Sequence, residues 1–405
     1  MKRALASILM IAALTACQEP EAPARAVDQA GWMVEHAPLY LGDRAWRRAR
    51  LEESLWRPEL PYARKRLDSV ALEVGGWDLL PEINASVAPV RAEGRPTGAF
   101  EGRALEAGRA PETAAQWREL GERVFWTMPM RRDAYVEWLV ERPELWAEVG
   151  LEVDEQGNLR GLTRFVDARG DARVGVTCGL CHGEGGVAGR GSRSLDLGRA
   201  RALFDRERGR EPGQYETWGP GRVDVTEDGQ SDVLTIKDLW GVPFATHINS
   251  SGAVALPTPA ALALRFETQY VVGHAMEARP SRVLTWALTM YVLTLDAPPS
   301  TPDLDSPGAR VFEGACAGCH DPARGYGGPL VDARALNSDP ASALSPARGT
   351  GFYKTPSLIG VGAGGPYLHD GGQPTLDALL DSGHPFGRAL PEPDRRALAS
   401  FLESL

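Results

Sequence analysis

The chain has 405 residues, and its 54 acidic side chains outnumber its 44 basic ones, which gives a formal net charge of −10 at pH 7. This acidic balance argues against a nucleic-acid partner and against adsorption to anionic lipid, and it favours basic partners. The length is too great for one hydrophobic core and predicts two or three domains.

The N-terminus has the pattern of an export signal. Lys2 and Arg3 form a positive region, and the apolar stretch 4–14 is too short to remain as a membrane-spanning helix. Residues 1–16 are therefore predicted to be a signal peptide. The run Leu14-Thr15-Ala16-Cys17 resembles the lipobox of bacterial lipoproteins, in which the cysteine is acylated and becomes the first mature residue. The alternative is ordinary cleavage, which would leave Cys17 as a spare thiol.

Residues 17–30 are predicted to be the lipidated cysteine and an extended tether, because this stretch is rich in Pro, Ala and Glu and has no hydrophobic pattern. Gln18 follows the cysteine, and by resemblance to bacterial lipoproteins this favours the outer membrane. The expected location is the periplasmic face of a bacterial membrane, reached through a lipid anchor.

Residues 31–165 are predicted to form a helical N-terminal region. Apolar residues recur at helical spacing in 114–124 and 135–146, whereas 91–113 is rich in Gly, Pro and Arg and is expected to be a surface loop. Eight of the eleven tryptophans lie in this region, and we expect their rings to form a core that packs on the next segment.

Two copies of Cys-x-x-Cys-His follow, Cys178-Gly-Leu-Cys181-His182 and Cys316-Ala-Gly-Cys319-His320. In this pattern two thiols add to the two vinyl groups of one porphyrin, and the histidine becomes the proximal ligand of the iron. The sequence therefore predicts two covalently bound c-type haems, with His182 and His320 as iron ligands. A zinc site or a redox dithiol is the alternative, but neither needs a histidine directly after each pair.

The segments 166–295 and 308–405 repeat one order of signals and are separated by a Pro-rich linker, 296–307. After its haem motif, each segment has a first histidine, a Pro-Thr pair that opens a helix, a second histidine and a closing helix. The histidines are His247 and His274 in the first segment, and His369 and His384 in the second. The predicted fold is mainly α, with two tandem cytochrome c-like haem domains preceded by the helical, Trp-rich region.

The sixth ligand of each iron is less constrained by the sequence. The segment 308–405 contains no methionine, so His384, His369, a tyrosine such as Tyr367 or an open position remain. In the first segment Met276 is an alternative to the two histidines.

The motifs Lys354-Thr-Pro-Ser-Leu358 and Pro366-Tyr-Leu-His-Asp-Gly371, together with the closing helix, resemble the C-terminal haem domain of the bacterial di-haem cytochrome c peroxidase and MauG family. The resemblance covers 308–405 closely and the first haem segment loosely. It implies that the distal ligand is His384, fifteen positions after His369, with His369 close to the iron or an alternative ligand. By the internal repeat, His274 becomes the ligand of the first haem, with His247 in the place of His369.

One departure from that family affects the expected activity. Peroxidases of this group carry, soon after the first haem motif, a histidine ligand that leaves on activation, and no histidine lies between His182 and His247. Peroxide chemistry also needs an open iron position and a nearby acid-base group. Asp370 and Glu184 are the candidates for such a group, and we assign no catalytic residue.

Electron transfer is therefore the leading functional prediction, with redox proteins, another cytochrome among them, as partners. The rival is a peroxidase-like or oxygenase-like enzyme with one open haem site. A structural or sensory haem lipoprotein is a third interpretation.

Overall fold

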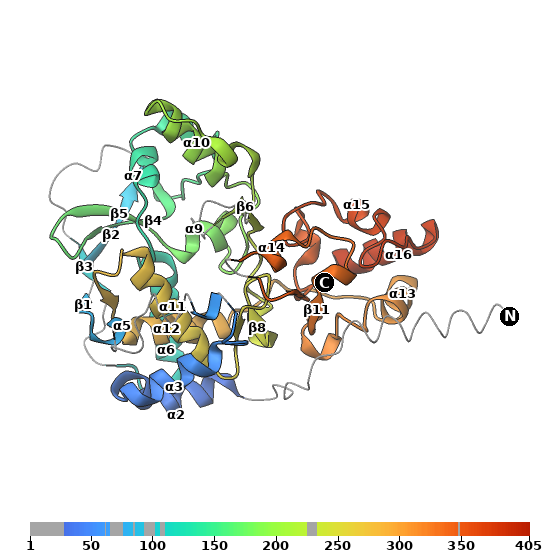
Figure 1. Ribbon diagram of the computed structural model, residues 1–405, viewed down its shortest axis with the longest axis horizontal. Helices are drawn as coiled ribbons and strands as arrows, with labels where there is room; N and C mark the ends of the chain where they lie inside the picture. Colours follow the sequence, from blue (N-terminus) through green and yellow to red (C-terminus); the bar gives the residue numbers. More distant parts are fainter. Residues whose placement is uncertain are drawn as a thin grey trace.

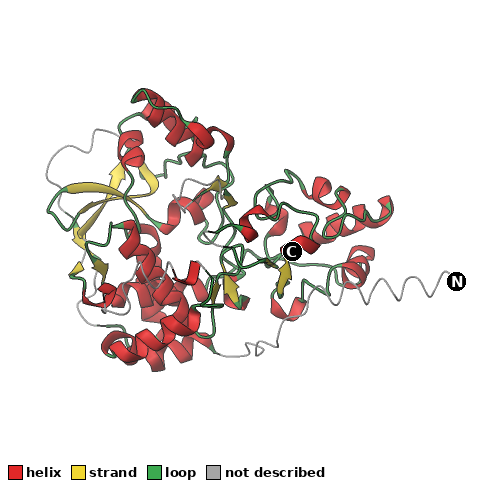
Figure 2. Ribbon diagram, viewed as in Figure 1, coloured by secondary structure: helices red, strands yellow, loops and turns green. Residues whose placement is uncertain are grey.

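The structure is a computed structural model that describes residues 28–60, 62–64, 76–83, 86–92, 102–105, 110–224, 233–346 and 349–405. It has a larger lobe and a smaller C-terminal lobe, the latter drawn in orange and red in Figure 1. Helices dominate both lobes, and short strands complete them (Figure 2). The predicted signal peptide and Cys17 lie outside the described residues. No helix within the described residues is long and apolar enough to cross a membrane.

A helical layer forms one side of the larger lobe (Figure 1). Its apolar faces enclose Trp117, Phe125 and Trp286, each at most 1% exposed. The side chains of Asp28, Asp43 and Thr113 accept hydrogen bonds from the first turns of their helices, which fixes where these helices begin. The layer consists of α2 (Gln29–Gly42), α3 (Arg44–Ser54), α6 (Ala114–Thr127), α11 (Pro259–Gly273) and α12 (Arg282–Leu293).

A buried network of charges crosses this layer. Asp78, in the short helix α5 (Gly76–Leu79), accepts hydrogen bonds from the guanidinium groups of Arg47 and Arg282. Glu267 is fully buried and accepts hydrogen bonds from Tyr40, at 2.9 Å, and Trp77, at 2.9 Å. Because ionised groups inside a protein are costly unless paired, these contacts fix the register of the helices.

A four-stranded antiparallel sheet lies beside the layer, in the order β3-β2-β4-β5. The sequence predicted a helical region before the first haem motif, but this region also contains strands of a sheet. The alternation of buried and exposed residues along β4 has the period of a strand. The four strands are β2 (Ser86–Arg91), β3 (Arg103–Ala104), β4 (Asn158–Val166) and β5 (Ala172–Val176).

Helix α7 (Ala134–Val140) packs on β5, and α8 (Pro143–Trp146) and α10 (Leu197–Glu207) pack on α7. Figure 1 shows α7 and α10 at the top of the larger lobe. The helix predicted over 135–146 is divided because Pro143 cannot continue a helix and instead occupies the first position of α8.

Short elements complete the larger lobe. Strand β1 pairs with β10 in parallel, whereas β6 pairs with β7 and β8 with β9 in antiparallel fashion. Their bounds are β1 (Glu82–Ile83), β6 (Arg222–Val223), β7 (Leu234–Thr235), β8 (His247–Ile248), β9 (Val254–Ala255) and β10 (Arg279–Pro280), with the 3₁₀ helices η2 (Glu184–Gly186), η3 (Gly213–Thr217) and η4 (Val242–Phe244).

The smaller lobe has an apolar core of its own, centred on Phe312, Leu398 and Phe401. The predicted helices from 376 and over 394–405 are confirmed, and the second begins two residues earlier than expected. The elements are α13 (Pro307–Ala315), α14 (Ala341–Leu344), α15 (Leu376–Asp381), α16 (Glu392–Glu403), the antiparallel strands β11 (Leu330–Asp332) and β12 (Phe352–Lys354), and the 3₁₀ helices η5 (Pro322–Arg324), η6 (Ala333–Ala335) and η7 (Val361–Ala363).

The two lobes contain the same kind of close helix crossing. In the larger lobe α6 crosses α12 at Gly121, where a Cβ atom would lie 2.1 Å from the carbonyl oxygen of Ala287 and 2.6 Å from Cβ of Tyr291. Four residues after Gly121, Phe125 meets Tyr291 with ring centroids 5.6 Å apart. Only glycine lets two helix backbones approach so closely.

The smaller lobe repeats this crossing residue by residue. Helix α13 crosses α16 at Gly308, where a Cβ atom would lie 2.1 Å from the carbonyl oxygen of Ala397 and 2.7 Å from Cβ of Phe401. Phe312, again four residues on, meets Phe401 at 5.4 Å. Both crossings carry the pattern Gly-x-Arg-Val-Phe, which did not enter the sequence prediction. Helix α6 therefore packs with the closing helix of the first haem segment, although the predicted boundary at 165/166 separates the two.

Candidate haem-binding sites

The first haem motif forms helix α9 (Cys178–His182), directly after strand β5. The Thr177 hydroxyl caps this helix and accepts a hydrogen bond from the amide of Gly179 at 3.2 Å. A Cβ atom at Gly179 or Gly183 would come within 2.5 Å of the Trp126 ring on α6. These two glycines therefore let the haem motif pack closely against helix α6.

His182 is held by its Nδ1 atom, which lies 2.9 Å from the backbone carbonyl oxygen of Lys237. A carbonyl only accepts, so Nδ1 carries the proton and the lone pair is on Nε2. Burial lowers the pKa of His182 below its ordinary value, which keeps the ring neutral. A neutral imidazole oriented through its other nitrogen is the usual state of a metal-binding histidine.

The second haem motif repeats this arrangement at the end of α13. The amide of His320 donates to the carbonyl of Cys316 at 2.9 Å, so the helical turn continues through the motif. Nδ1 of His320 lies 2.9 Å from the carbonyl oxygen of Tyr326, and burial lowers the pKa of this histidine as well. In both motifs the Nδ1 atom of the histidine is therefore held by a backbone carbonyl.

Three of the four cysteines of the motifs lie in protected surroundings, and the fourth, Cys319, is disulfide-bonded. Cys178, Cys181 and Cys316 are half-buried thiols. Burial raises the pKa of Cys178 to about 12, and those of Cys181 and Cys316 to about 11. Within the described residues, no three or more His, Cys, Asp or Glu side chains gather into a group that could hold a metal ion.

Burial and, after it, the charge of His320 lower the pKa of His384 to about 4. His384 is therefore neutral at physiological pH, which is the form of histidine that binds a metal. Its role as the distal ligand of the second iron stays a prediction.

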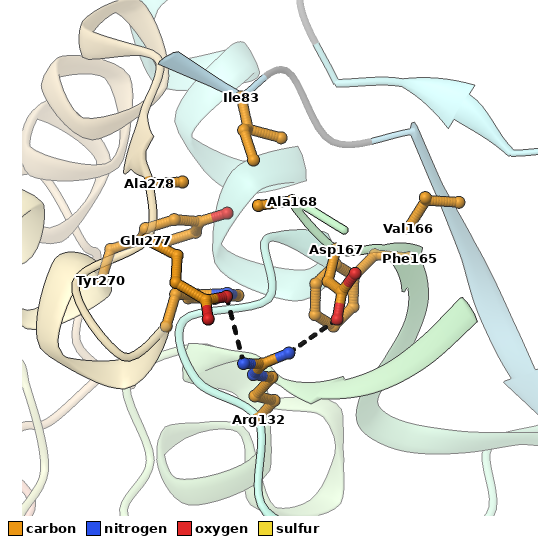
Figure 3. A pocket seen from close by; sticks show the side chains of 10 residues that line it. Ile83, Arg132, Phe165, Val166, Asp167, Ala168, Tyr270, Glu277 and Ala278 are labelled. Atoms are coloured by element: carbon orange, nitrogen blue, oxygen red, sulfur yellow. Dashed lines mark hydrogen bonds and ion pairs between the residues drawn. The ribbon is translucent and has the colours of Figure 1, made fainter. Parts of the chain in front are cut away.

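His274 lies in different surroundings. Its Nε2 atom is 2.7 Å from the carbonyl oxygen of Pro129, and its ring stacks on Tyr270 with centroids 4.0 Å apart. It is 6% exposed and lines a pocket. In this pocket Arg132 pairs with Asp167, at 2.6 Å, and with Glu277, at 3.3 Å (Figure 3). None of these contacts links His274 to His182, so its predicted role as a ligand gains no support from the structure.

The remaining candidate ligands also have neighbours outside the haem motifs. His247 packs edge-on against Trp56 at 5.2 Å, and its Nδ1 is 3.0 Å from the Thr246 hydroxyl. His369 stacks on Tyr353 at 4.0 Å. Met276 has a φ of +62° and packs against the helical core.

The loops that follow the two motifs meet at a seam between the lobes, which we define as 234–241 on one side and 354–369 on the other. Trp240 is 2% exposed, and its indole donates to the carbonyl of Ala188 at 3.1 Å. A Cβ atom at Gly360 would lie 2.5 Å from the same indole. The amide of Thr235 donates to the carbonyl of His369 at 2.8 Å. The seam therefore joins the surroundings of His182 to those of His320.

Comparisons with known proteins agree with a cytochrome. Residues 351–385 match the family model described as RoxA-like, cytochrome c-like. No curated relative matches the chain. A solved structure, hydrazine synthase of Kuenenia stuttgartiensis pressurised with 20 bar of xenon, aligns with a TM-score of 0.39 and 16% identity over 78% of this chain and 99% of that one. A likeness this low carries no structural argument.

The family match places a cytochrome c-like domain near the C-terminus, in the segment that contains His369 and His384. It supports a covalently bound c-type haem and a haem-based redox role. It does not single out the peroxidase and MauG family that the sequence resembles. The carbonyl groups that hold His182 and His320 belong to the backbone, so no residue type in the sequence could have revealed them.

Proposed function

We propose that the chain is a di-haem c-type cytochrome that transfers electrons. One haem would be attached at Cys178 and Cys181, and the other at Cys316 and Cys319. The observation that carries the proposal is that both motifs present a neutral histidine in the same way, through an Nδ1 hydrogen bond of 2.9 Å to a backbone carbonyl. The repeated crossings at Gly121 and Gly308 support one architecture around each haem.

The chain's own groups would orient each cofactor and keep water from it. Bound haem would supply one-electron redox chemistry. The carbonyls of Lys237 and Tyr326 fix the planes of the proximal rings and increase the basicity of Nε2. His384, neutral because of its lowered pKa, would be the distal ligand of the second iron. Two nitrogen ligands favour a lower potential than a methionine and a histidine would.

The seam supports electron exchange between the two sites. Trp240 contacts the loop after His182 and the loop that contains Gly360. Because the Trp240 ring is buried, protein atoms rather than water would fill the space between these two loops. An electron could therefore enter at one haem and leave at the other.

One observation favours the rival function. Nε2 of His274 bonds to the carbonyl of Pro129, so the first iron could have an open sixth position. The chain would then be a peroxidase-like or oxygenase-like enzyme, in which the second haem supplies electrons to the first.

Spectroscopy of the holoprotein separates these functions. An alkaline pyridine assay should give two c-type haems for each chain. For the transfer protein, the oxidised spectrum should be low-spin only, and cyanide and peroxide should react slowly. His384→Gly should add a high-spin fraction, whereas His274→Gln should not change the spectrum. A high-spin fraction and rapid peroxide turnover in the wild type would replace the transfer function with the enzymatic one.

We further propose that the chain is a lipoprotein on the periplasmic face of a bacterial membrane, with the outer membrane favoured, and that its partners are redox proteins, basic ones if electrostatically steered. The export pattern and the run before Cys17 support this. Cys17→Ser should move the protein from the membrane fraction to the soluble fraction or block its processing. A native protein that is soluble and begins at another residue would contradict the proposal.

A further inference from the structure

The larger lobe reaches the smaller lobe directly after helix α3. Leu55 ends this helix and is 5% exposed, which fixes where the next residue, Trp56, begins. The Trp56 ring packs edge-on against His247 of the larger lobe, with ring centroids 5.2 Å apart, and against Phe352 of the smaller lobe, at 5.8 Å. Trp56 therefore joins strand β8 of one lobe to strand β12 of the other.

Arg57 makes a second contact between the lobes. Its guanidinium donates a hydrogen bond to the carbonyl of Thr350 at 3.0 Å and lies 5.8 Å from the centre of the Trp56 ring. The backbone of Arg57 has a φ of +54°, in the left-handed region that residues other than glycine rarely adopt. Such a conformation persists only where the surrounding contacts impose it. The chain therefore takes an unfavourable turn at the residue that reaches the smaller lobe.

The turn 249–252, between β8 and β9, contacts the same part of the smaller lobe. The amide of Lys354 donates to the carbonyl of Ser250 at 2.8 Å, and the Thr350 hydroxyl donates to the carbonyl of Ser251 at 2.6 Å. Strand β12 and the residues just before it are therefore held from two segments of the larger lobe.

Strand β12 leads directly to residues that contact the second haem motif. The amide of Gly328 donates to the carbonyl of Thr355 at 3.4 Å, and Pro356 supplies a backbone hydrogen bond to His320. A movement of β12 relative to β8 would therefore carry the second haem motif with it and change its distance from the first.

We propose that Trp56 and Arg57 form a clasp that fixes the distance between the two haem motifs, and that Trp56 is a positioning residue for electron exchange between the haems. The clasp is a property of the fold, whereas the positioning role rests on the proposed haem function. The exchange moves one electron from the reduced haem to the oxidised one, with no further reactant. Because its rate depends on the distance between the two, a lobe that moves away would slow it.

Hydrogen exchange of the holoprotein tests the clasp. Two backbone amides bond across the lobes, that of Lys354 to Ser250 and that of Thr235 to His369, and they exchange when the lobes separate. Trp56→Ala removes both ring pairs and should raise their exchange rates by roughly 10- to 100-fold, because each pair lost favours the open state. Trp56→Phe keeps an aromatic ring and should restore most of the protection. Amides inside β4 and α16 should exchange as in the wild type.

Trp46→Ala is the matched control. Trp46 lies on the same helix, and its ring packs against Trp32 and His36 of the larger lobe. This variant should leave the exchange of the two interlobe amides, relative to amides in the cores, as in the wild type. If Trp56→Ala yields no holoprotein, Arg57→Met takes its place, because it removes the hydrogen bond to Thr350 and should raise the same exchange rates by a smaller factor.

The positioning role is measured by the rate at which an electron, introduced by flash reduction, redistributes between the haems. This rate should fall in Trp56→Ala and recover in Trp56→Phe. Unchanged exchange at the two interlobe amides in Trp56→Ala would overturn the clasp. Faster exchange with an unchanged electron-transfer rate would overturn the positioning role. A wild type without covalent haem would refute the proposed function, and the exchange rates of the protein as isolated would still decide for or against the clasp.

Discussion

The repeated helix crossing gives a prediction that can be worked out from distances. Gly308→Ala would place a Cβ atom 2.1 Å from the carbonyl oxygen of Ala397 and 2.7 Å from Cβ of Phe401. The first of these atoms belongs to the backbone, so α13 and α16 must move apart. Overpacking of this kind costs about 1–3 kcal/mol.

The same helix offers a matched control. Gly314 also lies in α13, and a Cβ atom there would meet nothing within 4 Å. Gly314→Ala should therefore stabilise the protein by roughly 0.5–1 kcal/mol, because alanine restricts the unfolded chain and has the higher helix propensity. The two Gly→Ala variants are thus expected to differ by roughly 2–4 kcal/mol.

The assay is thermal unfolding of the holoprotein, followed through the Soret band and through far-ultraviolet circular dichroism. A change of 1 kcal/mol in the free energy of unfolding moves the thermal midpoint of a domain of about 60–100 residues, the size of the smaller lobe, by about 4–8 °C. Gly308→Ala should therefore melt well below the wild type, and Gly314→Ala slightly above it. Equal midpoints for the two variants would refute the close crossing. If Gly121→Ala lowers the thermal midpoint as much as Gly308→Ala does, the helix crossing in the larger lobe is equally close.

Three further predictions concern burial, pH and haem content. Asp78→Asn should cost about 3–5 kcal/mol in urea unfolding, because it removes the carboxylate that pairs with the buried guanidinium of Arg47. Arg48→Ala, which breaks an exposed pair with Glu52, should cost less than about 1 kcal/mol. Similar losses in the two variants would contradict this contrast. Burial lowers the pKa of His274 to about 4, below the ordinary value of about 6.5. Between these two pH values only the unfolded chain binds the proton. The free energy of unfolding should therefore rise with pH, by up to about 3 kcal/mol for this group. Thermal midpoints measured from pH 4 to 7 should show this slope, and His274→Gln should flatten it; an unaltered slope would show that other groups titrate. Cys319→Ala should remove one of the two thioether bonds at the second motif and leave the first motif intact. Mass spectrometry and an alkaline pyridine spectrum identical to those of the wild-type haem groups would contradict the assignment.

The covalent chemistry was readable in the sequence because it depends on adjacent residues. Cysteines three positions apart with a histidine directly after them define a haem-attachment pattern without reference to the rest of the chain. Helical periodicity likewise located the closing helix over 394–405, since an amphipathic face is a local property. The match of 351–385 to a cytochrome c-like family agrees with this reading.

The tertiary structure decided which distant groups meet. His274 and His384 hold corresponding places in the repeated order of signals, yet their surroundings differ. Folding places His274 against Pro129 and Tyr270, whereas the charge of His320 acts on His384. Order along the chain does not encode where a ring points. The carbonyl of Lys237 that holds His182, and the contacts between Trp240 and Gly360 across the seam, join segments far apart in sequence, and such contacts depend on the packing of the whole chain.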